Sequence, residues 1–246
     1  MIQVVDFFKN INALKNSKRF ESEFFRGVVA VADSMVRATG CGAYIFDYLQ
    51  QTVVYVSQNI AKWCDATSNE ITKHGYDFYL KYINDEDLEM LFDINNAVFE
   101  FWNSIPNNEC ANFVVSYDFK FATLMVNQRY TPIVVENNNI TMAICVVSLS
   151  SSKTSGNIVM DSPRSEYKYE YSLPLKKWIK KRKIFLTDKE KEIICLSVQG
   201  FTSAEIAEKT SSSTETIRTQ KKHLYKKLHV GNITEAVRYV LNNSLW

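Results

Sequence analysis

The stretch TSAEIAEKTSSSTETIRTQKKHLYKKLHV, residues 202–230, contains two amphipathic patterns separated only by a run of serine and threonine. Hydroxyl side chains in residues 211–213 compete with helix continuation by bonding the backbone, so they predict a turn that also caps the next helix. In that second helix, Ile217, Leu224 and Leu228 fall within a narrow sector at 100° per residue, which predicts a core face. The opposite, polar and cationic face carries Glu215, Arg218, Thr219, Lys222 and Lys226.

Helix starts around this stretch are marked by capping side chains, most of which stand three residues before a glutamate. The capping pairs are Thr187 with Glu190, Thr202 with Glu205 and Asn232 with Glu235, and Ser213 supplies a fourth cap. Gly200 and Gly231 stand where the first and third helices should stop. The carboxy-terminal region is therefore predicted to be an all-α domain of four helices.

The length of 246 residues predicts two domains. Charge is divided unevenly between them: residues 1–175 hold 14 Lys/Arg against 20 Asp/Glu, a net −6, whereas residues 176–246 hold 15 against 7, a net +8. Clustered cations gain affinity for a polyanion by releasing its counterions. The basic part therefore points to nucleic acid or an anionic membrane as its partner.

The cysteines and the amino terminus exclude several classes of protein. The five cysteines are never spaced as C-x-x-C, so neither a disulfide framework nor a zinc site is indicated. Residues 1–20 carry Asp6, Lys9 and Lys15 where a signal peptide would need apolar residues, and no apolar run reaches membrane-spanning length. We expect a cytoplasmic protein with no metal, no cofactor and no membrane partner.

No group of residues predicts catalysis. Asp85, Glu86, Asp87 and Glu89 gather without a histidine or a second carboxylate cluster, and acids at this position suit the start of a helix. His74 stands alone and is interpreted as a structural residue. We therefore expect that the protein is not an enzyme.

The front part of the chain predicts helices followed by an α+β domain. Apolar spacing predicts two helices within residues 1–40, at 6–14 and 20–39. Residues 41–150 predict a strand hairpin, then helices, then three longer antiparallel strands at 112–126, 128–136 and 140–150. Residues 151–183 are rich in serine and proline and predict a linker, with an extra hairpin as the alternative, and residues 184–246 form the four-helix domain.

The order of elements in residues 43–150 resembles a PAS domain. In that family a five-stranded antiparallel sheet holds a few short helices over one face. The most recognisable piece is YLKYINDEDLEML, residues 79–91, where a helix opens after an acidic turn. The resemblance implies a PAS-like sensory domain.

Residues 186–241 resemble the LuxR-type helix-turn-helix domain, also called the GerE or NarL/FixJ type. The residues that carry the resemblance stand at the family's usual offsets: Leu186, Thr187, Glu190, Glu192, Gly200, Glu205, Ile206, Ala207, Ser213, Thr216, Ile217, Arg218, Lys227, Leu228, Glu235, Ala236 and Val237. The family implies that residues 213–230 are the DNA recognition helix and that the last helix is a dimer contact. Thr210, Ser212 and Gln220 depart from the pattern, in which apolar residues are usual near the first two positions and histidine near the third.

Helical geometry assigns roles to the predicted DNA-contacting residues. Arg218, Thr219 and Lys222 are expected to reach base edges, and Glu215 to accept from a cytosine amine. Phosphates are expected to be bound by Lys221, Lys226 and Lys227. Ser213, Thr216 and Gln220 complete the set. The basic segment KKWIKKRK, residues 176–183, is either a solvated linker or a phosphate-contacting arm.

These observations predict a bacterial transcription regulator that couples a PAS-like sensory domain to a LuxR-type DNA-binding domain. Its partners would be double-stranded DNA, a second copy in a homodimer, and RNA polymerase as a further candidate. The last helix offers Val237, Val240 and Leu241 for the dimer contact. Two alternatives for the front domain remain open: it binds a partner protein and no small ligand, or it is an acyl-homoserine-lactone sensor.

Overall fold

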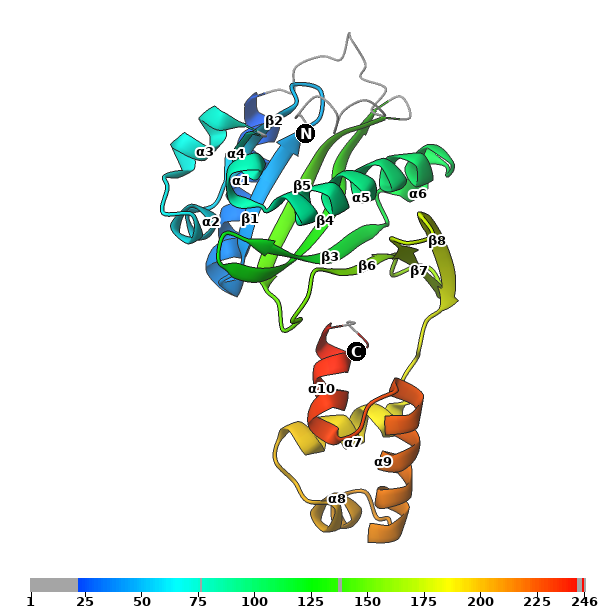
Figure 1. The fold of residues 1–246 in the computed structure, drawn as a ribbon. Helices are drawn as coiled ribbons and strands as arrows, with labels where there is room; N and C mark the ends of the chain where they lie inside the picture. Colours follow the sequence, from blue (N-terminus) through cyan, green and yellow to red (C-terminus); the bar gives the residue numbers. More distant parts are fainter. Residues whose placement is uncertain (1–21, 76, 137–138, 243–244, 246) are drawn as a thin grey trace. The chain divides into compact units, whose positions relative to one another are not determined.

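The computed structural model describes residues 22–75, 77–136, 139–242 and 245, in two compact units, Met1–Lys181 and Arg182–Trp246. The helix expected at residues 6–14 lies outside the described residues. The expected α+β fold class is confirmed, because a unit with an antiparallel sheet and helices is followed in the chain by an all-helical unit (Figure 1).

The front unit, Met1–Lys181, is built on one eight-stranded sheet with the strand order β2-β1-β5-β4-β3-β6-β7-β8. Its strands are β1 Gly42–Asp47, β2 Thr52–Val56, β3 Val114–Phe121, β4 Leu124–Glu136, β5 Asn139–Leu149, β6 Gly156–Asp161, β7 Tyr167–Ser172 and β8 Lys177–Arg182. The hairpin expected from the β-branched and aromatic residues of β1 and β2 is confirmed by their antiparallel pairing.

The boundary between β3 and β4 corrects the sequence interpretation. Residues 112–126 read as one strand, but the chain reverses at Ala122 and Thr123, and Phe121 then pairs with Leu124. Ala122 has a φ of 52°, a conformation that non-glycine residues rarely adopt. The backbone NH of Ala122 donates to the carbonyl oxygen of Tyr82 at 2.8 Å, so a tertiary contact fixes a turn that lacks a local turn signal.

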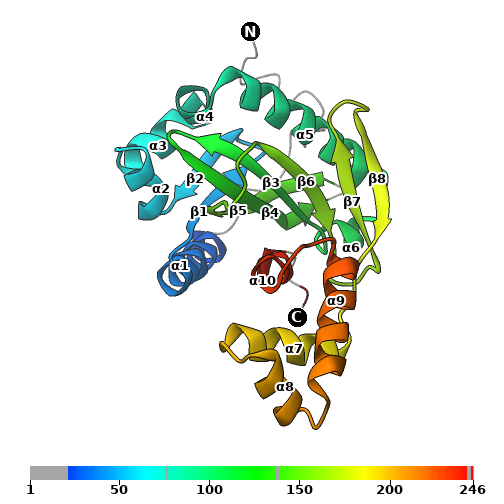
Figure 2. The same ribbon diagram turned by 60° about the horizontal axis from the view of Figure 1, so that its bottom comes forward.

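Helices lie on both faces of this sheet (Figure 2). One face is covered by α2 Gln58–Trp63, α3 Ser68–His74, α4 Asp77–Tyr82, α5 Asp85–Asn103 and α6 Asn107–Cys110, and the main core lies beneath them. On the other face, α1 Ser22–Thr39 packs against Ala43, Ile45, Tyr55 and Met142. No helix in the described part of the chain combines the length and apolar character that crossing a membrane requires.

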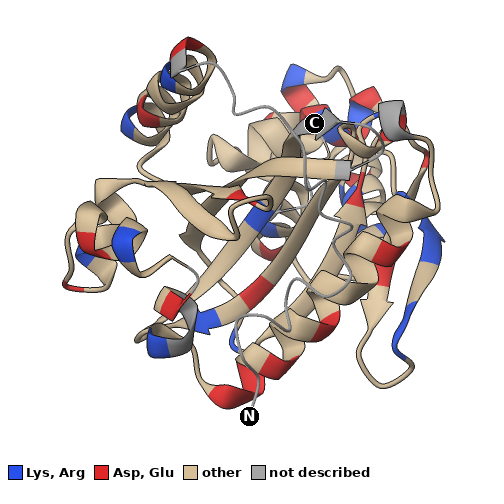
Figure 3. Ribbon diagram, turned by 90° about the horizontal axis from the view of Figure 1, so that it is seen from above, with Lys and Arg blue, Asp and Glu red and all other residues tan. Residues whose placement is uncertain are grey.

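The acidic residues before Leu88 start a helix, as expected. Asn84 is the N-cap of α5, and its side-chain oxygen accepts from the backbone NH of Asp87 at 2.8 Å. Asp87 is buried, and its carboxylate accepts from the backbone NH of Lys120 on β3 at 2.9 Å. The helix start is thereby fastened to the sheet. Acidic residues lie along α5, whereas basic residues lie along the edge strand β8 (Figure 3).

Residues 151–183, for which a linker or a further hairpin was expected, contain β6, β7 and β8. Buried Asp118 on β3 ties this extension to the sheet. Its carboxylate accepts from Asn157 at 2.7 Å, Ser150 at 2.8 Å and Asn127 at 2.9 Å. At the other end, the indole NH of Trp178 donates to the carbonyl oxygen of Ala97 at 3.0 Å. The segment is therefore part of the front unit.

The carboxy-terminal unit consists of α7 Asp188–Val198, α8 Ser203–Lys209, α9 Thr214–Leu228 and α10 Ile233–Asn242. The predicted capping boxes of α7 and α8 are confirmed, because Thr187 with Glu190 and Thr202 with Glu205 exchange both reciprocal hydrogen bonds. Asn232 accepts from the backbone NH of Glu235 at 2.9 Å at the start of α10. These three helix starts are therefore set by local side-chain chemistry that the sequence displays.

The end of α9 differs from the expectation. Gly231 was expected to stop the helix, but His229 is the C-cap and adopts the left-handed conformation with a φ of 57°. The backbone NH of Val230 then donates to the carbonyl oxygen of Tyr225 at 3.0 Å, which closes the last turn. At the end of α7, by contrast, Gly200 does have a positive φ of 89°.

Candidate DNA-binding surface and front-domain cavities

Helix α9 begins at a polar N-terminal turn. The hydroxyl of Ser213 accepts from the backbone NH of Thr216 at 3.0 Å, and the two hydroxyls share a hydrogen bond of 2.8 Å. Both residues are exposed. The first-turn amide groups of a helix favour anions. Ser213 and Thr216 therefore lie where a phosphate oxygen can approach.

The inward face of α9 is the predicted one. Ile217, Leu224 and Leu228 are at most 1 % exposed. Ile217 packs with Ile206 and Ala207 of α8, and Leu224 and Leu228 pack with residues of α7 and α10. Contact with the other three helices fixes the rotation of α9 about its axis, and with it the direction of the outward side chains.

The outward face of α9 presents the predicted polar and cationic residues to solvent, since Glu215, Arg218, Thr219, Lys222 and Lys226 are all exposed. The Arg218 guanidinium lies 3.8 Å from the Glu215 carboxylate, and both side chains are more than two-thirds exposed. Such a pair is weak in water. Arg218 can therefore exchange Glu215 for a guanine edge or a phosphate at small cost.

Three predicted contact residues, Gln220, Lys221 and Lys227, are only half exposed. Burial lowers the pKa of Lys221. The ammonium group of Lys227 lies 2.7 Å from the Glu190 carboxylate of α7, and the same oxygen accepts from the backbone NH of Thr187 at 2.7 Å. Lys227 thus already has an anionic partner within the domain.

Glu190 joins two elements through one carboxylate. Burial opposes its ionisation, but the hydrogen bonds from Lys227 and from the Thr187 backbone outweigh that effect, so the pKa of Glu190 lies below its usual value. The charged form therefore holds both the start of α7 and the end of α9. The capping motif was visible in the sequence, whereas the ion pair depends on how the helices pack.

Three lysines of the basic segment 176–183 make contacts within the front unit. Lys176 pairs with Asp93 at 3.2 Å, Lys181 pairs with Glu170, and the Lys180 ammonium lies 4.2 Å from the centroid of the Tyr167 ring. These residues belong to the edge strand β8, or to the turn before it, and lysines on an edge strand prevent pairing with other strands. These contacts favour a structural role over a phosphate-contacting arm.

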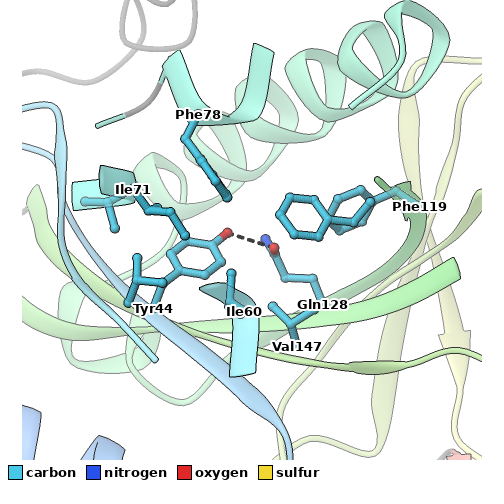
Figure 4. Close-up of a pocket in the computed structure, with 10 residues that line it drawn as sticks. Tyr44, Ile60, Ile71, Phe78, Phe119, Gln128 and Val147 are labelled. Carbon is cyan, nitrogen blue, oxygen red and sulfur yellow. Dashed lines mark hydrogen bonds between the residues drawn. The ribbon is translucent and has the colours of Figure 1, made fainter. Parts of the chain in front are cut away.

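Two small cavities lie between the sheet and helices α2–α5 of the front unit. One, of about 20 Å³, is lined mainly by apolar side chains, among them Ile60, Ile71 and Phe78 (Figure 4). The other, of about 40 Å³, is lined by the phenols of Tyr44, Tyr48, Tyr117 and Tyr130 together with Asn95, Cys145 and apolar side chains. One water molecule needs about 10–15 Å³ of such a cavity. The smaller cavity therefore has room for roughly one water and the larger for roughly three.

Tyr44 and Gln128 are buried and line both cavities. The Tyr44 hydroxyl donates to the Gln128 side-chain oxygen at 2.7 Å (Figure 4), and the Gln128 amide donates to the Tyr117 hydroxyl. Among the described residues, those that line the cavities include no charged side chain. In the same part of the chain, no group of three His, Cys, Asp or Glu side chains is arranged to hold a metal ion.

A compact helical unit that packs one side of α9 and exposes a cationic opposite side defines a helix-turn-helix DNA-binding domain. Residues 185–240 match the family of bacterial regulatory proteins described as the luxR family. This part of the chain is therefore a LuxR-type DNA-binding domain.

Solved structures with similarity to the whole chain include a phage VqmA–DPO complex, at 12 % identity over 92 % of each chain with a TM-score of 0.38. A Vibrio cholerae VqmA–ligand–DNA complex is 12 % identical over 86 % of each chain, with a TM-score of 0.28. The V. cholerae VqmA dimer without target DNA is 13 % identical over 86 % of each chain, with a TM-score of 0.29. TM-scores of this size do not establish a shared fold over the whole chain. No curated protein matched the sequence.

Proposed function

We propose that this protein is a cytoplasmic bacterial transcription regulator whose PAS-like front domain controls DNA binding by the LuxR-type domain. The observation that carries the proposal is the outward face of α9, where Arg218, Lys222 and Lys226 are exposed on a helix whose orientation is fixed by its buried side. Arg218 and Lys222, with Thr219 and Glu215, would contact bases, and Lys226 would bind phosphate. Gln220 and Lys221 would act at the margin of the contact, and Lys227, paired with Glu190, would support the position of the helix.

Titration of the full chain with duplex DNA tests this proposal. Binding should weaken steeply as salt rises, and selection from a random pool should recover paired half-sites if two copies bind. Lys222→Ala changes the outward face of α9, and Lys189→Ala, on the exposed surface of α7, is its control. Equal affinity of the two variants for the selected site, or no binding by the wild type at low salt, would exclude the proposed surface.

The PAS-like assignment is supported by the front unit, where β1–β5 form antiparallel pairs and α2–α6 lie over one face. Strands β6–β8 extend the sheet beyond the five strands of the family pattern. We propose that the unit receives the regulatory signal.

A small neutral ligand fits the chemistry of the cavities better than a charged one. Their lining offers phenols and amides, and burying an ion there without a counter-charge would cost several kcal/mol. The acyl chain of an acyl-homoserine lactone needs more space than either cavity provides. Any ligand larger than a few waters must enlarge the space, for example by displacing the Tyr44–Gln128 hydrogen bond.

The small volume favours the second candidate, a front domain that binds a partner protein and no small ligand. A thermal-shift screen of neutral and anionic metabolites on the full chain distinguishes the candidates. A neutral hit that raises the melting temperature and also changes DNA affinity supports ligand sensing, because only a ligand that binds two states unequally can signal. Stabilisation without any change in DNA affinity supports the partner-protein candidate.

A further inference from the structure

His223 is a further exposed residue on the outward side of α9, beside those already assigned to DNA. At 100° per residue it stands about 40° from Thr219 and about 60° from Lys226 around the helix axis. Buried Ile217 and Leu224 are each about 100° or more away from it. The imidazole therefore lies on the side of the helix that would meet DNA.

His223 lies at the flank of the outward face and not at its centre. Arg218, Glu215 and Lys222, which would contact bases, stand about 80–140° away from it around the axis. When a helix lies in the major groove, its flanks face the phosphates that border the groove. Exposed Thr216 shares this flank, about 20° from His223 around the axis and about 10 Å along it. Two side chains that can bind phosphate oxygens therefore follow one edge of α9.

The His223 imidazole has no anionic partner in the described part of the protein. Of the residues one turn away on α9, Thr219 and Gln220 are neutral, whereas Lys226 and Lys227 are cationic. No described residue forms a hydrogen bond or an ion pair with its side chain. A proton on the imidazole would therefore gain a negative partner only when a phosphate approaches.

The helices packed against α9 do not supply this negative partner. α7 brings the Glu190 carboxylate to 2.7 Å from the Lys227 ammonium, and the same carboxylate caps α7. α10 covers the inner side of α9, where Val240, expected at a dimer contact, is instead fully buried in a core with Leu224 and Leu228. Neither α8 nor α10 forms a hydrogen bond or an ion pair with the imidazole in the described ranges. Their charged residues are Glu205, Glu208, Lys209, Glu235 and Arg238.

We propose that His223 is a proton-dependent phosphate contact: the protonated imidazole binds a DNA phosphate, and DNA binding takes up a proton from solution at this side chain. The inference rests on the proposed DNA binding by α9. An imidazole in water changes its charge between about pH 8 and pH 5, and an adjacent anion favours the charged form. Lysine, arginine and glutamate side chains in water keep their charge over that range. The affinity for DNA should therefore rise as pH falls, because His223 gains a charge that the other contacts already have.

Fluorescence anisotropy of the full chain on the selected duplex, at about pH 5.5 and about pH 8 and constant ionic strength, tests the contact. Wild-type affinity should be about three- to tenfold higher per copy at the lower pH. The slope of log K against log salt should also be steeper there by about 0.9 per copy, which a purely structural role would not produce. His223→Gln should bind as the wild type does at the higher pH and gain nothing at the lower one. His223→Lys should bind tightly, with the steeper slope, at both pH values.

His229→Asn is the matched control, because His229 is exposed at the left-handed C-cap of the same helix, a conformation that asparagine tolerates. This variant should keep the pH response of the wild type. The proposal is overturned if His223→Gln keeps the response, if His229→Asn loses it, or if His223→Lys binds more weakly than His223→Gln at the higher pH. Equal wild-type affinity at both pH values overturns it too but leaves the proposed DNA binding standing. No binding at either pH, even at low salt, excludes both.

Discussion

Lys226 and Lys227 are adjacent in sequence but should affect different properties when each is replaced by alanine. Lys226 is exposed on the outward face of α9, whereas Lys227 is paired with Glu190 at 2.7 Å. Each phosphate contact changes the slope of log K against log salt by about 0.9. Lys226→Ala should therefore make the slope shallower by about 0.9 per copy, or about 1.8 for a bound dimer. Lys227→Ala should leave the slope nearly unchanged.

Lys227→Ala should instead destabilise the carboxy-terminal unit. The pair is half buried and also supports the α7 cap, so its loss should cost about 1 kcal/mol. For a domain of this size, that lowers the melting temperature by about 4–8 °C.

Fluorescence anisotropy of the full chain on labelled duplex DNA, at several salt concentrations, gives the slopes, and thermal unfolding followed by circular dichroism gives the stabilities. The reasoning fails if Lys227→Ala changes the salt slope as much as Lys226→Ala does. It also fails if Lys226→Ala lowers the melting temperature and Lys227→Ala does not. The first result would mean that Lys227 also contacts a phosphate, and the second would mean that Lys226, and not Lys227, stabilises the fold.

Further outcomes follow from other parts of the two units. Arg218→Ala should cost about 1–3 kcal/mol of binding to a selected site and relax specificity at one base, as measured by competition with single-base variants of that site. Ile217→Ala should cost about 2–5 kcal/mol of stability and largely unfold the carboxy-terminal unit at 37 °C, visible as lost helical circular dichroism, whereas exposed Thr219→Ala should not. Gln128→Leu removes the acceptor of the Tyr44 hydroxyl and should lower the free energy of unfolding of the front unit, measured by urea denaturation, by about 1–3 kcal/mol. The pKa of Glu190 is lower in the folded state than in the unfolded state. The charged carboxylate therefore stabilises the fold above the ordinary glutamate pKa, and this stabilisation is lost as pH falls through the folded-state pKa. The melting temperature of the wild type should fall between pH 7 and pH 3, and that of Glu190→Gln should fall less.

The carboxy-terminal unit could be predicted almost fully from sequence because its helix boundaries are local. Thr187, Thr202 and Ser213 cap helices that begin at the following residue, and the buried face of α9 follows directly from apolar spacing. The stop at His229 was not predicted, because a glycine two residues later carries the stronger local signal. The pairing of Lys227 with Glu190 joins residues from different helices, so it could not be predicted from the spacing within one helix.

The front unit was predicted less completely because its decisive contacts are distant in sequence. The turn at Ala122 is held by Tyr82, and the extension β6–β8 is held by Asp118 and Ala97, which lie far away in the chain. The sequence offered strands in this extension only as the alternative of an extra hairpin, because serine- and proline-rich composition also fits a linker. The cavities could not be predicted, since apolar residues in a sequence do not distinguish a cavity from complete packing.

The division of α9 into a buried side and an outward side has a consequence for how new regulators of this kind can arise. Ile217, Leu224, Leu228 and the Lys227–Glu190 pair set the orientation of the helix, while Thr219, Lys222 and Lys226 make few contacts that the fold needs. Exchanging outward residues should therefore redirect the protein to a different operator without redesign of the scaffold. The buried side holds α9 in place, so the DNA sequence that the domain prefers can change through the outward residues alone.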